Sequence, residues 1–359
     1  MLKGNIIMKF GEIEILEKAE SALRKCLQKV PFLELKAMER NRSSADTEID
    51  ILATVRLGLK EQSIAVEVKS NGQPRIVRMA TYQLQRFLRG NPGTYCIVAA
   101  PYISPQAADI CTGEGIGYLD LAGNCRITFD QVFIQQEGNP NPFAQKRDLR
   151  SLYSPKAARV LRVLLNDPKR SWKIQPLAEE ASVSLGQVSN VKSLLEDREW
   201  ITSGDAGFLL NAPELLLAEW AENYDFRKNP ARNYYTLKTI SEFEADLAIV
   251  CDELGIPYAL TGFSAAARYA PSVRYQRSMA YAARNVDEIA GRLSLKEVSS
   301  GANVTIMTPY DEGLLYGSRL IDGIRVAAPV QAYLYLRGIK GRGEEAASAL
   351  MEGVIRKAW

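Results

Sequence analysis

A stretch rich in proline and glycine at residues 137–142, Glu-Gly-Asn-Pro-Asn-Pro, constrains this chain more than any other feature because it divides the sequence. Proline lacks an amide hydrogen and fixes its own backbone angle, so this stretch continues neither a helix nor a central strand. At 359 residues the chain is long enough for two or three domains. We therefore expect separate folding units on its two sides, with a weaker boundary at residues 211–213.

Histidine is absent, which narrows the chemistry that the chain can perform. Ser-His-Asp and Cys-His catalytic groups are excluded, as are zinc sites that need imidazole. The five cysteines include no Cys-x-x-Cys pair, which argues against a zinc ribbon and a thioredoxin-like site. Scattered cysteines are typical of a reducing compartment, so we expect a cytoplasmic protein. No apolar run reaches about 18 residues, and we expect no membrane partner.

The part of the chain before the proline stretch predicts an α/β domain. Residues 13–30 and 74–89 place apolar residues at helical spacing. Residues 48–57 and 63–70 alternate apolar and polar side chains, and the polar residues between them predict a hairpin. Residues 94–101 form an apolar run typical of a buried strand. This order of elements predicts a mixed sheet.

Charged side chains are expected to meet where the hairpin strands pair. Strand side chains alternate between faces, so Glu67 and Lys69 share the face opposite the apolar residues. Asp50 lies on the corresponding side of the partner strand and can converge with them. Two carboxylates are hard oxygen ligands suited to Mg²⁺, which can activate water beside a phosphodiester with a lysine assisting. Asp50 and Glu67 are therefore the candidate metal ligands.

Asp50 and the triplet 67–69, Glu-Val-Lys, in the order helix, strand, strand, helix, resemble the PD-(D/E)xK superfamily of restriction-endonuclease-like proteins. The resemblance covers about residues 12–135 and implies a catalytic set with a glutamine from the following helix, where Gln83 occupies an inward position. It also implies a glutamate from the first helix, for which Glu20 is a candidate. The alternative is that the triplet is only a solvated strand face.

Residues 154–212 predict a small helical unit with a terminal hairpin. The turn of the hairpin lies at residues 203–206, and Ser184 is expected to cap the last helix. The expected helices cover residues 155–166, 174–181 and 185–196. Helix, helix–turn–helix and hairpin together predict a winged helix-turn-helix.

The segment 184–195 resembles recognition helices of bacterial regulators. Such a helix lies in the major groove, where Gln and Asn can read adenine edges and cationic side chains contact phosphates. The alternative is a winged helix that binds protein, because this unit carries nearly as many acids as bases. The expected DNA-binding residues are Ser184, Gln187, Ser189, Asn190 and Lys192 in the helix, with Arg170 outside it.

The chain has no acidic residue between Leu254 and Val286, where arginines and tyrosines interleave. This pattern can follow a phosphate backbone and stack bases. The alternative is that the tyrosines are core and the arginines form a solvated face. The expected DNA-binding residues here are Arg268, Arg274 and Arg277. A second run without acids holds Arg227, Lys228, Arg232 and Lys238.

Four short motifs begin at Thr261 (Thr-Gly-Phe-Ser-Ala-Ala), Gly301 (Gly-Ala-Asn-Val), Pro329 (Pro-Val-Gln-Ala-Tyr-Leu) and Gly341 (Gly-Arg-Gly-Glu-Glu-Ala-Ala). Together they resemble the AbiEi antitoxin family, over about residues 150–359. The resemblance implies a regulator of a bacterial type IV toxin–antitoxin system, with a nucleotidyltransferase-like C-terminal domain and a cognate toxin as partner. No Asp-x-Asp pair follows the Gly-Phe-Ser of the first motif, so we expect no transferase activity.

The sequence thus predicts an α/β multidomain protein. The expected domains are a restriction-endonuclease-like α/β domain at residues 1–140, a winged helix-turn-helix at 150–212 and a nucleotidyltransferase-like α/β domain at 213–359. The first functional hypothesis is a DNA-binding transcriptional regulator, with double-stranded DNA and a toxin protein as partners and a homodimer as its expected state. The alternatives are a DNA endonuclease with Mg²⁺ at Asp50 and Glu67, and a protein-interaction scaffold.

Overall fold

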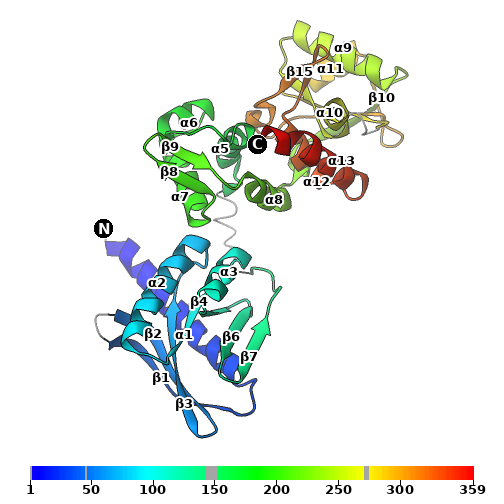
Figure 1. Cartoon of the computed structure of the whole chain (residues 1–359). Coiled ribbons are helices and arrows are strands. Elements are labelled where there is room, and N and C mark those ends of the chain that lie inside the picture. Colours follow the sequence, from blue (N-terminus) through cyan, green and yellow to red (C-terminus); the bar gives the residue numbers. More distant parts are fainter. Residues whose placement is uncertain (1, 45–46, 143–151, 271–274) are drawn as a thin grey trace. The chain divides into compact units, whose positions relative to one another are not determined.

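The computed structural model describes residues 2–44, 47–142, 152–270 and 275–359 and divides into two compact units (Figure 1). Unit 1 comprises Met1–Lys146 with Glu196–Glu199, and unit 2 comprises Arg147–Leu195 with Trp200–Trp359. Each unit contains a seven-stranded sheet together with helices, which confirms the predicted α/β multidomain class.

Unit 1 is a sheet with helices on both faces (Figure 1). Its strands lie side by side in chain order, and the β3–β4 and β4–β5 neighbours are parallel while the others are antiparallel. The helices are α1 (Leu2–Leu27), α2 (Pro74–Gly90) and α3 (Pro105–Gly113). The strands are β1 (Leu33–Ser44), β2 (Thr47–Leu57), β3 (Lys60–Val68), β4 (Tyr95–Ala100), β5 (Gly117–Asp120), β6 (Cys125–Phe129) and β7 (Val132–Gln136).

Alternation of side chains separates the two apolar layers of unit 1. Ile51 and Val66 pack in the layer of α1, whereas Ala65 packs in the layer of α2 and α3. The predicted hairpin is confirmed, since β2 and β3 pair antiparallel and Gly58 adopts a φ of 58° in their turn. The sequence did not indicate β1, because charged residues interrupt its apolar pattern; an edge strand tolerates them.

Unit 2 begins with a helical segment and a hairpin and continues into a second sheet. The first part contains α5 (Pro155–Asn166), α6 (Ile174–Glu180), α7 (Leu185–Asp197), β8 (Ile201–Gly204) and β9 (Gly207–Leu210). The further helical segments are α8 (Pro213–Asn223), η1 (Phe226–Lys228), α9 (Ile240–Glu253), α10 (Gly262–Tyr269), α11 (Val286–Arg292), η2 (Glu312–Leu315), α12 (Pro329–Arg337), α13 (Arg342–Leu350), η3 (Met351–Ile355) and α14 (Arg356–Ala358). The remaining strands are β10 (Ala231–Tyr235), β11 (Tyr258–Leu260), β12 (Ser278–Ala282), β13 (Lys296–Glu297), β14 (Val304–Met307), β15 (Arg319–Ile321) and β16 (Ile324–Val326).

The second sheet has the strand order β13-β10-β14-β12-β11-β16-β15. Side chains of α9 and α11 pack on one face, where Phe243 and Ile289 join the strand residue Tyr258. A separate cluster contains Tyr335 of α12 with Met279 and Tyr281 of β12. This sheet is therefore covered by helices from both sides.

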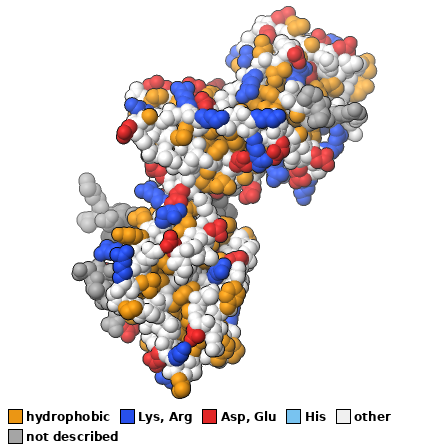
Figure 2. Space-filling view, viewed as in Figure 1, with side chains coloured by type: hydrophobic (Ala, Val, Ile, Leu, Met, Phe, Trp, Pro, Cys, Tyr) orange, Lys and Arg blue, Asp and Glu red, His pale blue; other side chains and the backbone are white. Residues whose placement is uncertain are grey.

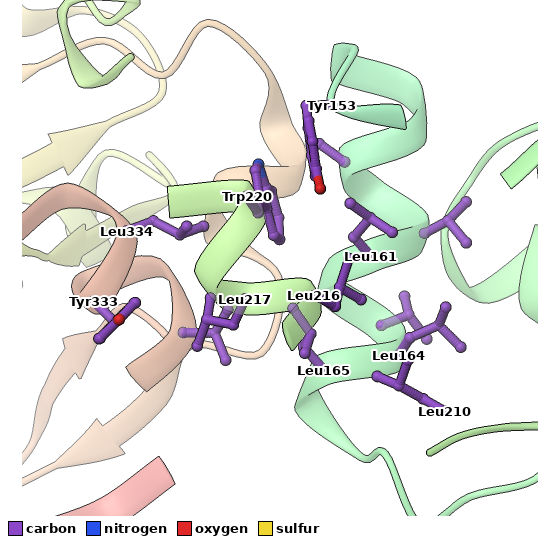
Figure 3. Close-up of a cluster of buried hydrophobic side chains, with 14 of the residues drawn as sticks. Tyr153, Leu161, Leu164, Leu165, Leu210, Leu216, Leu217, Trp220, Tyr333 and Leu334 are labelled. Atoms are coloured by element: carbon purple, nitrogen blue, oxygen red, sulfur yellow. The ribbon is translucent and has the colours of Figure 1, made fainter. Parts of the chain in front are cut away.

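One hydrophobic cluster joins the helical segment of unit 2 to the helices of the second sheet (Figure 3). Trp220 of α8 stacks on Tyr153 with ring centroids 6.2 Å apart, and Leu161 of α5 and Leu334 of α12 belong to the same cluster. Arg159 of α5 also forms a two-pronged ion pair with Asp311, which lies just before η2. Residues 152–195 and 200–359, on both sides of the predicted boundary at residue 213, thus lie in one compact unit and share a core.

Within the ranges that the structure describes, no helix combines the length and the apolar character needed to cross a bilayer.

Candidate active site and nucleic-acid interface

The β2–β3 hairpin positions the first two predicted site residues. The pairing of the two strands ends at Ile51 and Val66. Asp50 directly precedes Ile51 in β2 and Glu67 directly follows Val66 in β3, so both lie at the same end of the paired segment. The Asp50 carboxylate accepts a hydrogen bond from the backbone N–H of Val68 at 2.7 Å. This bond holds the Asp50 side chain against β3, next to the position of Glu67.

Lys69 connects Glu67 to α2. Its Nζ donates a hydrogen bond to Glu67 Oε1 at 2.5 Å and another to Gln83 Oε1 at 2.9 Å. Gln83 reaches Lys69 because the buried face of α2, which includes Ala80 and Leu84, packs on the same side of the sheet as Glu67. The structure therefore brings together Asp50, Glu67, Lys69 and Gln83.

Burial dominates the electrostatics of Glu67. The side chain is 4% exposed, and this burial raises its pKa above the usual range for glutamate. The hydrogen bond from Lys69 opposes the increase, while the negative charges of Asp50 and Glu48 add to it. A carboxyl group with a raised pKa beside a second carboxyl group is typical of a functional site.

The carboxylate oxygens of Asp50 and Glu67 are the atoms that a divalent cation would contact. Glu67 Oε2 is buried and has no hydrogen-bond partner, which is unusual for a carboxylate oxygen. Among the described residues no group of three carboxylate or thiol side chains gathers as a metal site. A cation at Asp50 and Glu67 would take its further ligands from water or a phosphate, as Mg²⁺ commonly does. The donor set fits Mg²⁺ on these terms.

Glu20, the other candidate suggested by the resemblance, is engaged elsewhere. Its two carboxylate oxygens accept hydrogen bonds from Arg40 of β1 at 2.7 and 2.6 Å. The structure thus pairs Glu20 with an arginine, and no contact with the other four site residues is found among the described residues.

The predicted recognition segment is a helix, α7, that begins as expected. Ser184 Oγ accepts a hydrogen bond from the backbone N–H of Gln187, which satisfies one of the unpaired donors of the first turn. Ser189 and Asn190 are exposed, whereas Gln187 is half-buried. An open pocket of 840 Å³ lies at the turn between α6 and α7, and Lys156 is among its lining residues together with Ser184 and Gln187.

Two predicted phosphate contacts lie against aromatic rings of the same unit. The guanidinium group of Arg170 lies 3.8 Å from the ring centroid of Trp172, and Arg170 remains exposed. The Lys192 ammonium group lies 5.8 Å from the ring centroid of Phe208 in β9. Cation–π contacts of this kind orient the two side chains and do not neutralise their positive charges.

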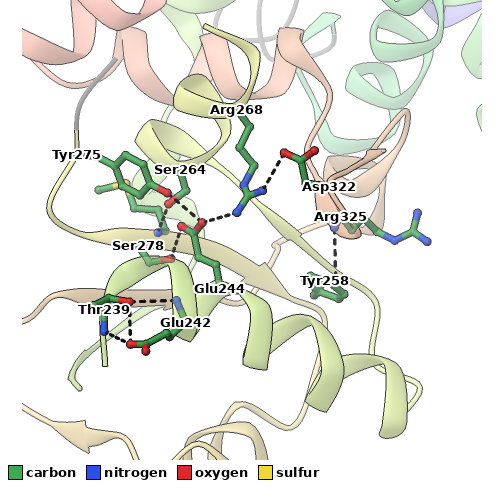
Figure 4. A network of polar contacts seen from close by, with 11 residues as sticks. Thr239, Glu242, Glu244, Tyr258, Ser264, Arg268, Tyr275, Ser278, Asp322 and Arg325 are labelled. Atoms are coloured by element: carbon green, nitrogen blue, oxygen red, sulfur yellow. Dashed lines mark hydrogen bonds and ion pairs between the residues drawn. The ribbon is translucent and has the colours of Figure 1, made fainter. Parts of the chain in front are cut away.

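The predicted basic surface of residues 254–286 is largely internal (Figure 4). Arg268 is 16% exposed, and its Nη2 donates a hydrogen bond at 3.0 Å to Glu244, a carboxylate that is 0% exposed. Arg277 is half-buried and donates from Nε to the carbonyl oxygen of Ala302. Arg274 lies outside the described residues. The Arg268 charge is thus neutralised inside the protein and does not contribute to an exposed DNA-binding surface.

Three of the four cationic residues in the second run without acids, Arg227, Arg232 and Lys238, form ion pairs. Arg227 bonds Asp225, and Lys238 bonds Asp246 at 2.5 Å. Arg232 pairs with Glu297 of β13 and with Asp287 of α11. On the face shown in Figure 2 acidic and basic side chains are interspersed, in keeping with a net charge of +3. A linear window without acids therefore does not produce a basic surface here.

Glu244 was not predicted from the sequence, although the polar contacts in Figure 4 centre on it. Besides Arg268, Tyr275 donates to its Oε2 and Ser278 to its Oε1, each at 2.9 Å. The residue follows the buried Phe243 in α9, so the helical apolar pattern was the available signal. That pattern places Glu244 on the inner face but does not identify its partners.

Residues 209–356 match the family model described as a transcriptional regulator, the AbiEi antitoxin of type IV toxin–antitoxin systems. The match begins in β9 and ends at the start of α14, and so includes the second sheet. Over these residues it confirms the predicted resemblance to this family. No curated protein matches the chain.

Three solved structures are similar to part of the chain. One is a repair endonuclease from Pyrococcus abyssi, with 14% identity, 28% of this chain and 46% of that chain covered, and a TM-score of 0.23. EndoMS in its apo form shows 16% identity over 28% and 45%, with a TM-score of 0.21. An EndoMS–dsDNA2 complex shows 13% identity over 29% and 44%, with a TM-score of 0.20. The chain spans less than half of the length of each of these structures.

Proposed function

We propose, from the AbiEi antitoxin character of residues 209–356, that the chain is a DNA-binding transcriptional regulator in which α7 reads duplex DNA. The supporting observation is the order α5, α6, α7 and the β8–β9 hairpin, with Ser189 and Asn190 exposed on α7. We assign this segment as a winged helix-turn-helix, whose second helix in the pair α6–α7 would enter the major groove. The family likeness favours a toxin protein as a second partner.

Asn190→Ala is expected to weaken duplex binding about tenfold, because one bidentate contact of asparagine with adenine contributes roughly 1–3 kcal/mol. The measurement is a titration by gel shift, using a duplex that the wild-type protein selects from a random pool. Asn223→Ala is the matched control, since this exposed asparagine of α8 bonds only the carbonyl of Glu219 in its own helix among the described contacts. Equal affinities of the wild type and Asn190→Ala would favour a protein-binding winged helix instead.

A second function is supported by the four residues that meet at the end of β3. We infer that unit 1 is a PD-(D/E)xK-like nuclease module in which Asp50 and Glu67 hold Mg²⁺. The bound ion would supply an activated water and stabilise charge on the phosphodiester. Lys69, held between Glu67 and Gln83, supplies a positive charge beside the attacked phosphate. We also propose a nucleotidyltransferase-like fold for residues 213–359, for which we expect no transferase activity.

The wild-type protein is expected to nick supercoiled plasmid in the presence of Mg²⁺ and to lose this activity in EDTA. The metal dependence follows because the site has no histidine and relies on two carboxylates for water activation. Conversion of the supercoiled to the open-circular form over time is the measurement. A plasmid that stays intact with Mg²⁺ and with Mn²⁺, yet shifts on a gel, would contradict the nuclease function and leave the regulator function in place.

A further inference from the structure

The helix that carries Gln83 has an exposed surface that the proposed metal site does not use. α2 contains four arginines and no acidic residue. Its apolar face packs in the core, but Met79 and Tyr82 are 58% and 62% exposed. Large apolar side chains left in solvent beside cationic ones are typical of an interaction surface.

This surface borders the site directly. Residues three or four apart on a helix are neighbours, so Met79 and Arg86 lie on the two sides of Gln83 along the helix. Tyr82 is likewise a neighbour of Met79 and Arg86 at these spacings. Gln83 itself contacts Lys69, which contacts Glu67. A ligand that extends from Glu67 along α2 therefore passes over Met79, Tyr82 and Arg86.

The charges on this part of α2 are available for a ligand. Arg75 and Arg78, nearer the start of the helix, form ion pairs. For Arg86 and Arg89, both exposed, no ion pair is found in the part of the chain that the structure describes. Two cationic side chains one turn apart, next to an exposed ring, are complementary to a nucleotide strand with its alternating phosphates and bases.

We propose that Met79, Tyr82 and Arg86 bind a single strand of DNA beside the Asp50 and Glu67 site. An unpaired base stacks on Tyr82 and Met79 while its phosphate contacts Arg86, and Arg89 contacts the next phosphate. Bases inside a duplex already stack on their neighbours, so the exposed ring favours unpaired nucleotides. The inference rests on the proposed function only in placing nucleic acid at Asp50 and Glu67. It adds a preference of unit 1 for single-stranded DNA, whereas α7 is proposed to read duplex DNA.

The test measures binding without cleavage. The full-length protein is titrated in EDTA against a short fluorescent single-stranded oligonucleotide and against the same sequence as a duplex. Tyr82→Ala is expected to weaken single-strand binding about tenfold, the lower part of the range for loss of one stacked base, and to leave duplex binding unchanged. Arg86→Ala is expected to lower the slope of log affinity against log salt by about 0.7. Phe133→Ala in β7 is the control, since Phe133 is also 62% exposed.

Three results would overturn the inference: no single-strand binding by the wild type, unchanged binding by Tyr82→Ala, or an equal loss in Phe133→Ala. Since Tyr82 is exposed, its replacement leaves the core intact, and a melting curve checks this. The outcome is separable from the nuclease function. If Tyr82→Ala binds single strands normally while the wild type nicks plasmid, only the proposed single-strand surface is rejected. If Tyr82→Ala binds single strands more weakly while the wild type does not nick plasmid, only the nuclease function is rejected.

Discussion

Glu67→Gln and Asp50→Asn are each expected to reduce the Mg²⁺-dependent nicking rate about a thousandfold. Metal-bound water and metal-stabilised charge contribute several kcal/mol to such a reaction, and about 1.4 kcal/mol corresponds to a factor of ten. Each substitution keeps the size of the side chain and removes the negative charge that would hold the ion. The measurement is the first-order rate of plasmid conversion at saturating protein and Mg²⁺.

Glu20→Gln is the matched control for this loss. Glu20 is a carboxylate of the same unit that bonds Arg40, so its replacement leaves the proposed metal ligands intact. An activity loss in Glu20→Gln equal to that of Glu67→Gln would contradict the assignment of the metal site. So would full activity in Asp50→Asn.

Glu67→Gln has a second expected effect, on stability. Burial raises the pKa of Glu67, so the Glu67 carboxyl group binds a proton more tightly in the folded chain than in the unfolded chain. As pH rises from the ordinary glutamate pKa through the raised one, the folded state loses stability, and this penalty persists at neutral pH. An amide does not ionise, so the variant should melt at a higher temperature than the wild type at neutral pH. The difference should shrink as the pH falls toward the ordinary range, and a lower melting temperature at neutral pH would contradict the argument.

Glu244→Ala is expected to lower the free energy of unfolding of unit 2 by about 3–5 kcal/mol. The substitution removes one partner of a buried ion pair and leaves the Arg268 charge in the interior without a carboxylate. It also leaves the hydroxyl groups of Tyr275 and Ser278 without their acceptor. All four tryptophans of the chain lie in unit 2, so tryptophan fluorescence during urea unfolding reports on this unit.

Glu242→Ala provides the comparison, because it removes a glutamate two residues earlier in the same helix. Glu242 is exposed and closes a capping box with Thr239, so its loss should cost only about 1 kcal/mol. If both variants lost the same free energy of unfolding, the argument that the buried contacts of Glu244 stabilise unit 2 would be contradicted.

Local periodicity and the resemblance to the PD-(D/E)xK superfamily together led to the candidate site of unit 1. The alternation of β2 and β3 determines which side chains share a face, and the helical spacing of α2 places Gln83 near that face. Hydrogen bonds from Lys69 to Glu67 and Gln83 agree with that prediction. The edge strand β1 escaped prediction because its exposed position permits a pattern of charges that no periodicity rule recognises.

Partners far apart in the sequence account for what the sequence could not predict. Arg268 lies in a long segment without acids, yet its partner Glu244 comes from the preceding helix, 24 residues away. Arg232 similarly meets Glu297 across 65 residues. Charge pairing of this kind depends on strand order and helix packing, which a window of sequence does not contain.

If α7 reads DNA as proposed, the hydrophobic cluster around Trp220 would restrict the exchange of DNA specificity between related chains. A graft limited to residues 152–212 would separate Leu161 and Leu165 of α5 from Leu217 of α8 and Leu334 of α12, leaving apolar surface open on both pieces. A graft that carries α8 and α12 along keeps this surface closed. We therefore expect recombination that changes the recognised DNA to preserve folding when residues 152–359 move as one block.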